Sequence, residues 1–562
     1  MDRRTLLLGG LSLPAVLSAQ AQPSPTAPAV SESPSAWLTR NLEAIRARHR
    51  VPALAGAIVM NGRIAAEAAT GFRKEGAGAR VQVTDAFQLG SITKPMTATL
   101  TAIFVEKGML RWDLTMESAF PELLGLMNSA YRKVTITQLL SHVSGMPYMP
   151  RTEPPDMFAS DRNTPHARYA EVKTRLKDEP EAPPRTKVIY TGGSIIVAHI
   201  LERLTNKLWE ELIRIHVFEP LGMRTANTGD DNARVPAVVD RPWQHRLNGE
   251  KIIPVVPVGL GPPGFSRAHA PAGHANSSVG DLARFMIAHL PAASPQLLRP
   301  ETLRFLQTPV LGDFCPGWEH GEASWTGGSF VHHNGTNMLN VADAYVLPGR
   351  NAAYCAAANV AGPAAWTALF EANSLARWTV LNGRFRDPVV FRAFGRKAPA
   401  EEITVEFWQK VNAVQEQSTF EMNIVSGQNR ISAHVPWATG DVIWDFGDWE
   451  HGGRLQYRPP ASLVGQWHHF ALVASRRQSG MAIYRNAIEQ ARKQGSSHFV
   501  AGDYDLFVGW GINPFGGEVR EFRVWDRART QVEIQRDLNS VLNGSESGLL
   551  AYWRGESGSG GG

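Results

Sequence analysis

Ser91 and Lys94 are a pair of residue types that can perform nucleophilic chemistry. They lie three residues apart at the start of a helix predicted over residues 91–106 and closed by Gly108, so their side chains share one helical face. A serine hydroxyl becomes a nucleophile when a base takes its proton. Lys94 can be that base if burial and a neighbouring cation lower its pKa from about 10.4 to near 7. Taken alone, the spacing also fits a capped helix followed by a solvated lysine.

Tyr190 is a second residue whose setting permits acid–base chemistry. It precedes a predicted helix whose apolar stripe contains Ile196, Ile200 and Leu204. A tyrosine at such a junction usually packs against its neighbours, with its hydroxyl satisfied by a hydrogen bond. If Tyr190 instead faces a lysine, we expect the pKa of its phenol to fall below the usual value of about 10, so that it can act as a general base.

The run from His332 to Thr336 leads into a predicted strand and contains a third candidate group. Gly335 allows backbone to approach a ligand closely, so the N–H of Thr336 is a candidate oxyanion donor. His332 and His333 are otherwise a surface feature or a pair of metal ligands, but no third ligand occurs at a recognised spacing. We therefore expect neither a metal ion nor another cofactor.

In this order, the three signals resemble the serine β-lactamase and penicillin-binding-protein family, especially its class C, esterase and D-aminopeptidase branch. The resemblance extends from about residue 52 to residue 378. It rests on the collinear motifs GSITKP (90–95), ITQLLSHVSGM (136–146), FEPLGM (218–223), DLARF (281–285) and HNG (333–335). It implies an α+β domain in which helices flank an antiparallel sheet and form a helical subdomain.

The resemblance also implies roles for the matching residues. Ser91 would be the acylated nucleophile, Lys94 its proton acceptor, and Tyr190 the base that assists acylation and activates the deacylating water. The backbone N–H groups of Ser91 and Thr336 would form the oxyanion hole. The pocket would be lined by His333, Gly335 and Gly192.

Two positions depart from the family pattern. Gly192 stands where many members have asparagine two residues after the tyrosine, and His333-Asn334-Gly335 stands in place of Lys-Thr-Gly. Both changes remove groups that hold the amide and the carboxylate of a β-lactam, which argues against β-lactamase activity. The pattern fits the esterases and small-peptide hydrolases of the family better.

The hydrolase-like domain, residues 36–386, has an alternating pattern of helices and strands. A hairpin is predicted over residues 51–72 with its turn at Asn61-Gly62, and two strands at 339–347 and 352–360 precede a further helix. Because strands occur at both ends of the domain with helices between them, we expect one sheet built from both ends.

The pattern changes near residue 387 to short strands with period-two alternation, which predicts an all-β sandwich over residues 387–556. The predicted strands are 403–407, 468–474, 481–484, 506–508 and 518–525. This part resembles the laminin-G-like, concanavalin A-like jelly-roll family through GQWHHFALV (465–473), IYRN (483–486), GGEVREFRVW (516–525) and GLLAYW (548–553).

Members of the jelly-roll family often bind glycans or proteins. The resemblance therefore implies a contact with glycans or the cell envelope through the sandwich. Trp444 and Trp449 lie near a predicted turn and are candidates for stacking on a sugar ring; packing in the core or at a sheet edge is the alternative.

The first 21 residues match a cleavable bacterial signal peptide, because a charged start is followed by a short apolar stretch and by Ala19-Gln20-Ala21. Its paired arginines fit a twin-arginine signal, and an ordinary secretory signal is the alternative. We expect an exported protein, periplasmic or secreted, whose mature chain begins near Gln22. Residues 22–35 are predicted to be a disordered leader, and 557–562 a flexible tail.

Composition and charge exclude several classes of protein. The 562 residues are 43% hydrophobic and 19% charged, which fits more than one globular domain and excludes wholesale disorder. No apolar run reaches the roughly 20 residues of a transmembrane helix. The net charge of +5 is scattered, so we expect no nucleic-acid partner. Cys315 and Cys355 are too few for a disulfide framework, although one bridge forms if their thiols meet.

We therefore expect an exported serine hydrolase that cleaves an amide or peptide bond through a Ser91 acyl-enzyme. The expected substrate is a small molecule or peptide, such as a linear or D-amino-acid-containing peptide. Linearised microcystin is one example, because a bacterial peptidase of that compound belongs to the family this chain resembles and has a similar length. The alternatives are a carboxylesterase of the same family, a β-lactamase, and a catalytically dead surface-binding protein. Intact Ser91, Lys94 and Tyr190 argue against the last.

Overall fold

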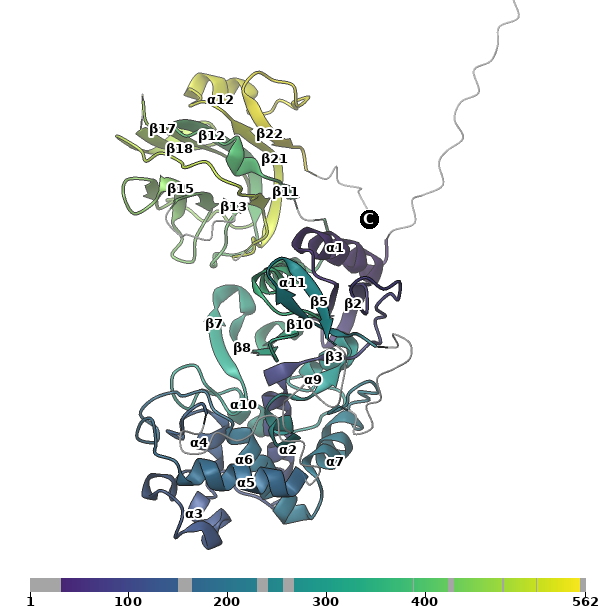
Figure 1. Cartoon of the computed structure of the whole chain (residues 1–562). Coiled ribbons are helices and arrows are strands. Elements are labelled where there is room, and N and C mark those ends of the chain that lie inside the picture. Colours follow the sequence, from purple (N-terminus) through teal and green to yellow (C-terminus); the bar gives the residue numbers. More distant parts are fainter. Residues whose placement is uncertain are drawn as a thin grey trace, which may run out of the picture. The chain divides into compact units, whose positions relative to one another are not determined.

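The computed structural model describes residues 32–149, 164–229, 241–255, 267–387, 389–422, 429–477, 480–511 and 513–555 (Figure 1). The predicted signal peptide lies outside these ranges, as do most of the predicted leader and the predicted tail. Helix α1 (Pro34–His49) includes the last two residues of the predicted leader, which are therefore helical. No helix within the described residues is long and apolar enough to cross a membrane.

A six-stranded antiparallel sheet organises the first domain, in the order β2-β1-β10-β9-β8-β7. Its strands are β1 (Ala53–Met60), β2 (Arg63–Gly71), β7 (Glu319–Ala323), β8 (Gly328–Thr336), β9 (Val341–Leu347) and β10 (Ala352–Ala358). Strand β1 pairs with β10, which joins the two ends of the domain in one sheet, as predicted. The predicted hairpin is also confirmed, because Asn61 and Gly62 adopt the positive φ values of +53° and +70° that a tight two-residue turn needs.

Both faces of this sheet are covered by helices (Figure 1). Alternate residues of a strand point to opposite faces. Leu54 belongs to a buried cluster with residues of α1 and α11 (Pro363–Asn382), whereas Ala55 belongs to the cluster that contains residues of α9 (Val279–Ile287). The sheet is thus the middle layer of an α+β domain.

The remaining helices of the first domain form its helical part. They are α2 (Thr93–Glu106), α3 (Met116–Ala119), α4 (Ile136–Leu140), α5 (Thr164–Lys177), α6 (Gly193–Thr205), α7 (Trp209–Ile213), α8 (Ala270–Gly273) and α10 (Pro300–Leu306). Helix α2 is buried at every position from Thr93 to Phe104. The described part of the domain also contains two short antiparallel pairs: β3 (Phe87–Gln88) with β6 (Asn276–Ser277), and β4 (Gln244–Asn248) with β5 (Lys251–Val255).

Across its described residues, the second domain contains two six-stranded antiparallel sheets, consistent with a jelly roll. One sheet contains β11 (Val389–Phe391), β13 (Phe420–Met422), β14 (Asn429–His434), β15 (Val442–Asp448), β16 (Arg454–Tyr457) and β20 (Leu506–Val508). The other contains β12 (Glu402–Val411), β17 (Trp467–Ser475), β18 (Gly480–Arg485), β19 (Ile488–Lys493), β21 (Gly517–Trp525) and β22 (Leu549–Trp553). Each of the five predicted strands falls within one of these.

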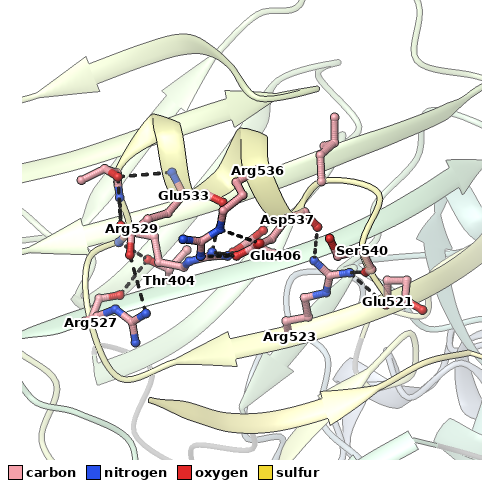
Figure 2. Close-up of polar contacts among 12 residues, drawn as sticks. Thr404, Glu406, Glu521, Arg523, Arg527, Arg529, Glu533, Arg536, Asp537 and Ser540 are labelled. Carbon is pink, nitrogen blue, oxygen red and sulfur yellow. Dashed lines mark hydrogen bonds and ion pairs between the residues drawn. The ribbon is translucent and has the colours of Figure 1, made fainter. Parts of the chain in front are cut away.

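Helix α12 (Gln531–Asp537) of the sandwich was not predicted, although Thr530 and Glu533 form a capping box at its start. An ion-pair network holds it to the sheet (Figure 2). The fully buried guanidinium of Arg529 pairs with Glu406 of β12 and with Asp537 of α12. The helix is thus fastened to the sheet by buried charge as well as by the apolar contact of its Ile534.

Trp444 is a core residue of the sandwich, so the prediction that it could stack on a sugar is wrong. Its side chain is 0% exposed and its indole N–H donates to the Val473 carbonyl at 3.2 Å. Trp449 is half-buried, and the guanidinium groups of Arg430 and Arg454 lie 4.8 and 4.3 Å from its ring centroid.

Cys315 and Cys355 are both buried free thiols. The bridge that the sequence left open is therefore not formed.

Candidate active site

Ser91 and Lys94 lie where a 3-10 turn passes into a buried helix. Ser91 is the middle residue of η1 (Gly90–Ile92), and Lys94 is in the first turn of α2. The side-chain nitrogen of Lys94 lies 2.9 Å from Oγ of Ser91 and donates to the backbone carbonyl of Ala272 at 2.9 Å. The predicted shared face is confirmed, and it puts amine and hydroxyl in hydrogen-bond contact.

Burial changes the acid–base properties of Lys94. The side chain is only 6% exposed. Burial first, and then the positive charge of Arg175, lower the pKa of the Lys94 amine to about 7. A large fraction of Lys94 is therefore neutral near pH 7 and can accept a proton. The two conditions under which Lys94 was expected to act as a base, burial and a neighbouring cation, are therefore both met.

Tyr190 contacts both members of this pair. Its side chain hydrogen-bonds to Ser91, and the nitrogen of Lys94 lies 4.7 Å from its ring centroid. The expectation that a neighbouring lysine lowers the pKa of the phenol is wrong, because burial raises that pKa above its usual value and outweighs the hydrogen bond to Ser91. Tyr190 is thus a neutral phenol next to the candidate nucleophile, and Lys94 is the better proton acceptor.

His142 fixes the position of Tyr190, a role that its place in the SHVSG motif did not reveal. The two rings stack with centroids 4.4 Å apart. The backbone N–H of Thr191 donates to Nδ1 of His142 at 3.0 Å, so this nitrogen carries no proton. Burial first, and then the nearby Lys94 amine, lowers the pKa of His142 well below its usual value. His142 is therefore a neutral ring that packs against the phenol.

Two glycines bring the end of β8 against the Ser91 turn. A Cβ atom at Gly335 would lie 1.9 Å from the carbonyl oxygen of Leu89 and 2.9 Å from the nitrogen of Ser91. A Cβ atom at Gly90 would lie 2.4 Å from the nitrogen of Thr336. Only glycine permits this contact. The backbone nitrogens of Ser91 and Thr336 are thus held close together, as an oxyanion hole requires.

His333 is buried beside Tyr190, with ring centroids 6.2 Å apart, and is not part of the cavity wall. The prediction that it lines the pocket is therefore wrong, and Gly335 is also absent from the wall. Nδ1 of His333 donates to the Asn334 carbonyl at 2.5 Å. Burial, and then the charge of Lys94, lower the pKa of His333 to about 3, so it carries no positive charge.

A cavity of about 420 Å³ opens onto Ser91. Of the predicted residues it brings together Ser91, Lys94, Tyr190, Thr336 and Gly192. The other residues of its wall are Gln88, Tyr148, Met149, Arg175, Thr191, Ile195, His269, Ala272, Gly273, His274, Asn337 and Met338.

The cavity wall also contains residues that the sequence analysis missed, above all Arg175 of α5. Arg175 is 4% exposed, and its Nε donates to Glu171 at 2.7 Å. No motif marks this arginine. Nowhere in the described residues do three or more His, Cys, Asp or Glu side chains gather as metal ligands would.

Comparisons with known proteins identify the family of each domain. Residues 38–377 match the family model described as Beta-lactamase, and residues 387–535 match the model of the concanavalin A-like lectin/glucanases superfamily. Penicillin-binding protein 4 of Amycolatopsis lactamdurans is 28% identical over 333 residues, which are 56% of this chain and 82% of that protein. A protein of Aspergillus campestris named as an unguisins hydrolase is 28% identical over 155 residues, 26% of this chain and 28% of its own length.

Among solved structures, the octameric penicillin-binding protein homologue from Pyrococcus abyssi is similar with a TM-score of 0.49 and 18% identity, covering 80% of this chain and 99% of that one. The D-alanine carboxypeptidase AmpC of Burkholderia cenocepacia has a TM-score of 0.48 and 17% identity, covering 62% and 98%. Because the Beta-lactamase match alone spans more than half of the sequence, the chain belongs to the β-lactamase and penicillin-binding-protein family of serine hydrolases.

Proposed function

We propose that this protein is an exported hydrolase that cleaves an amide bond of a small peptide through an acyl-enzyme on Ser91. The observation that carries the proposal is the contact between Ser91 and Lys94, 2.9 Å from oxygen to nitrogen, in a site that lowers the pKa of the amine to about 7. A lysine that is neutral near pH 7 can accept the serine proton without any other base. The export signal predicted in the first 21 residues supports the location.

In the proposed acylation, the Ser91 oxygen attacks the substrate carbonyl while its proton passes to Lys94. The negative charge that develops on the carbonyl oxygen is stabilised by the backbone N–H groups of Ser91 and Thr336. Expulsion of the amine then requires a proton, which the neutral Tyr190 phenol can deliver because it is hydrogen-bonded to Ser91. The phenol regains its proton from the protonated Lys94, whose nitrogen lies over its ring.

Deacylation reverses these steps with water in place of the amine. Neutral Lys94 takes a proton from water through the Tyr190 hydroxyl, and the hydroxide attacks the ester carbonyl of the acyl-enzyme. Collapse of the second tetrahedral intermediate releases the carboxylic acid and returns the proton to Ser91. The two steps together consume one water molecule and one amide bond. Tyr190 serves as a relay in both directions.

β-Lactams are disfavoured as substrates because the two groups with which the family holds them, an asparagine and a lysine, are absent from their usual positions. Gly192 has no side chain to bind the β-lactam amide. His333, which stands where the family often has lysine, is buried and neutral with a pKa of about 3, so it supplies no cation for the carboxylate of a β-lactam.

A peptide substrate is supported by the appended sandwich, because a second domain of a family that often binds glycans or proteins suits a peptide or envelope substrate. The relative named as an unguisins hydrolase gives limited further support, since the match covers only 28% of that protein. The acyl-enzyme chemistry also accepts esters, so activated esters serve as assay substrates for the same site.

The proposal is tested by labelling the full chain with a fluorophosphonate and locating the adduct by mass spectrometry. We expect one adduct, on Ser91, and none in Ser91→Ala. A panel of short linear peptides, D- and L-amino-acid anilides, nitrophenyl esters and a chromogenic β-lactam then identifies the bond cleaved. Turnover that persists in Ser91→Ala would exclude Ser91 as the nucleophile. If the wild-type protein shows neither adduct nor turnover, the alternative of a catalytically inactive surface-binding protein is favoured.

A further inference from the structure

Arg175 is a buried cation in the cavity wall that the proposed proton transfers do not use. Its side chain is 4% exposed, yet it lines the same cavity as Ser91 and Lys94. Placing a guanidinium in such a site is costly unless its donors find acceptors. A donor of Arg175 that has no acceptor within the protein therefore indicates which chemical group of a ligand the cavity can bind.

Only part of the guanidinium is satisfied within the protein. Nε donates to the Glu171 carboxylate at 2.7 Å, and Nη1 makes a long contact of 3.5 Å with the carbonyl of Tyr148. For Nη2, no acceptor is found among the residues that the structure describes. One edge of the planar group is thus anchored, while the other retains donors.

Gly192 opens the space beside these donors. A Cβ atom at Gly192 would lie 3.1 Å from Nη2 and 3.2 Å from the central carbon of the Arg175 guanidinium. Any larger side chain at this position would crowd or cover the arginine. The absence of a side chain two residues after Tyr190 therefore exposes a cation close to the reacting groups, and Arg175 reaches the position that the family's asparagine would otherwise occupy.

Glu171 holds the guanidinium in this orientation. Its side chain is 1% exposed, and it also lies 3.4 Å from Nε2 of His269, another wall residue. Burial opposes ionisation of Glu171, but its hydrogen bond to His269 and the charge of Arg175 outweigh burial and keep its pKa below the usual value. The anchored carboxylate fixes Arg175 before any substrate binds, which reduces the entropy lost on binding.

We propose that Arg175 binds a carboxylate of the substrate, so that the enzyme prefers peptides or esters with a free carboxylate next to the scissile bond. The planar fork of an arginine matches a carboxylate better than any other side chain does. A cavity of about 420 Å³ is large enough for a substrate of this size. This inference rests on the proposed acyl-enzyme chemistry at Ser91 and adds the substrate class to it.

The test compares matched substrates at pH 9, where Lys94 is largely neutral. One pair carries the carboxylate on the acyl side: 4-nitrophenyl glutarate and its methyl ester. The other carries it on the leaving side: an acylated lactic acid and the same acylated lactamide. We expect the wild-type enzyme to prefer the free acid at least about tenfold in kcat/KM in one of the pairs.

In Arg175→Gln, kcat/KM for the preferred acid should fall about 10- to 100-fold, while that for its neutral partner changes less than about threefold. Arg175→Lys keeps the positive charge but loses the planar guanidinium. Its preference for the free acid should lie between that of the wild type and that of Arg175→Gln. Lys173→Gln removes a positive charge from the same helix outside the cavity wall and should leave the preference unchanged. An equal loss on acid and neutral substrate, or no acid preference in either wild-type pair, would overturn the inference.

Two controls distinguish a failure of the Arg175 proposal from a failure of the proposed acyl-enzyme function at Ser91. At pH 9 the neutral fluorophosphonate should still label Ser91 of Arg175→Gln, because this probe carries no carboxylate for Arg175 to bind. If the wild type itself is not labelled, the proposed function fails; if labelling is intact and the acid preference is absent, only the role of Arg175 fails. Because Arg175→Gln leaves Glu171 buried without its partner, Glu171→Gln/Arg175→Gln provides a version in which both charges are removed together, and it should lose the acid preference to the same extent.

Discussion

The buried guanidinium of Arg175 acts on the amine of Lys94 inside the cavity that both side chains line. Its positive charge is the second cause, after burial, of the low pKa of Lys94. One residue therefore has two effects on the site: it disfavours a proton on the base, and it offers a charge to the substrate. The two effects separate in experiment, because the first depends on pH and the second on the charge of the substrate.

The first prediction concerns the pH dependence of the wild-type enzyme with a neutral ester. Because the base is the neutral form of Lys94, with a pKa of about 7, kcat/KM should rise with pH to a plateau above 8. Below pH 6 it should fall roughly tenfold per pH unit. Initial rates between pH 5 and 9 measure this acidic limb, the part of the profile in which kcat/KM rises with pH. In Arg175→Gln the limb should move to higher pH, since the variant loses a cation that disfavours protonation. A rate that is level between pH 6 and 8 would argue against Lys94 as the base.

The second prediction concerns the hydroxyl of Tyr190. Tyr190→Phe keeps the ring that stacks on His142 but removes the relay, so the steady-state rate should fall by about 10²- to 10⁴-fold. Since burial raises the pKa of the phenol, the wild-type profile should show no loss or gain of rate at pH 8–10 from its ionisation. Stopped-flow measurement of nitrophenol release separates acylation from deacylation. Unchanged rates for both steps would exclude the relay role.

Local signals in the sequence anticipated those features that depend on neighbouring residues. The turn at Asn61-Gly62 follows from the φ preferences of its two residues, and the contact of Ser91 with Lys94 follows from helical spacing. Helix α12 also had a readable signal, the Thr530–Glu533 capping box, but the strand pattern around it concealed a helix of two turns.

Features that depend on distant segments could not be read in the same way. Arg175 enters the cavity only because α5 packs beside α6, so that Gly192 leaves space for its guanidinium. The pKa of Tyr190 was predicted in the wrong direction for a similar reason. The sequence allowed us to expect a lysine near Tyr190. The burial that raises the pKa of the Tyr190 phenol, however, depends on packing by His142 and other residues far along the chain.

The third prediction concerns the close approach of Gly335 to the Ser91 turn. In Gly335→Ala the new methyl group would lie 1.9 Å from the Leu89 carbonyl oxygen, so strand and turn must separate and the two oxyanion donors move apart. We expect kcat/KM to fall at least about 100-fold. Gly125→Ala is the matched control, since a Cβ atom there meets nothing within 4 Å and should leave the rate unchanged. Equal rates in the two variants would show that Thr336 is not an oxyanion donor.

The last prediction concerns the buried network of the sandwich (Figure 2). Arg529 and Glu406 are both 0% exposed, and Arg529 also pairs with Asp537. Arg529→Met leaves two carboxylates without this partner, one of them fully buried, so the sandwich should lose about 3–5 kcal/mol of stability. Arg527→Met is the control. Its side chain is 40% exposed and its ion pairs are long, at 3.6 and 3.8 Å, so a loss below about 1 kcal/mol is expected.

Differential scanning calorimetry of the full chain measures both sandwich variants, and fluorophosphonate labelling of Ser91 reports on the hydrolase domain in the same samples. The transition that moves in Arg529→Met should be that of the sandwich, with labelling retained at temperatures below it. The pKa of Glu406 lies below its usual value: burial opposes ionisation, but His469 and Arg529 outweigh it. Its contribution is therefore present above the pKa of an unfolded glutamate and is lost as the pH falls. Acid should accordingly narrow the difference between wild type and Arg529→Met, and a gap that widens below pH 4 would contradict an ionised Glu406 in the folded sandwich.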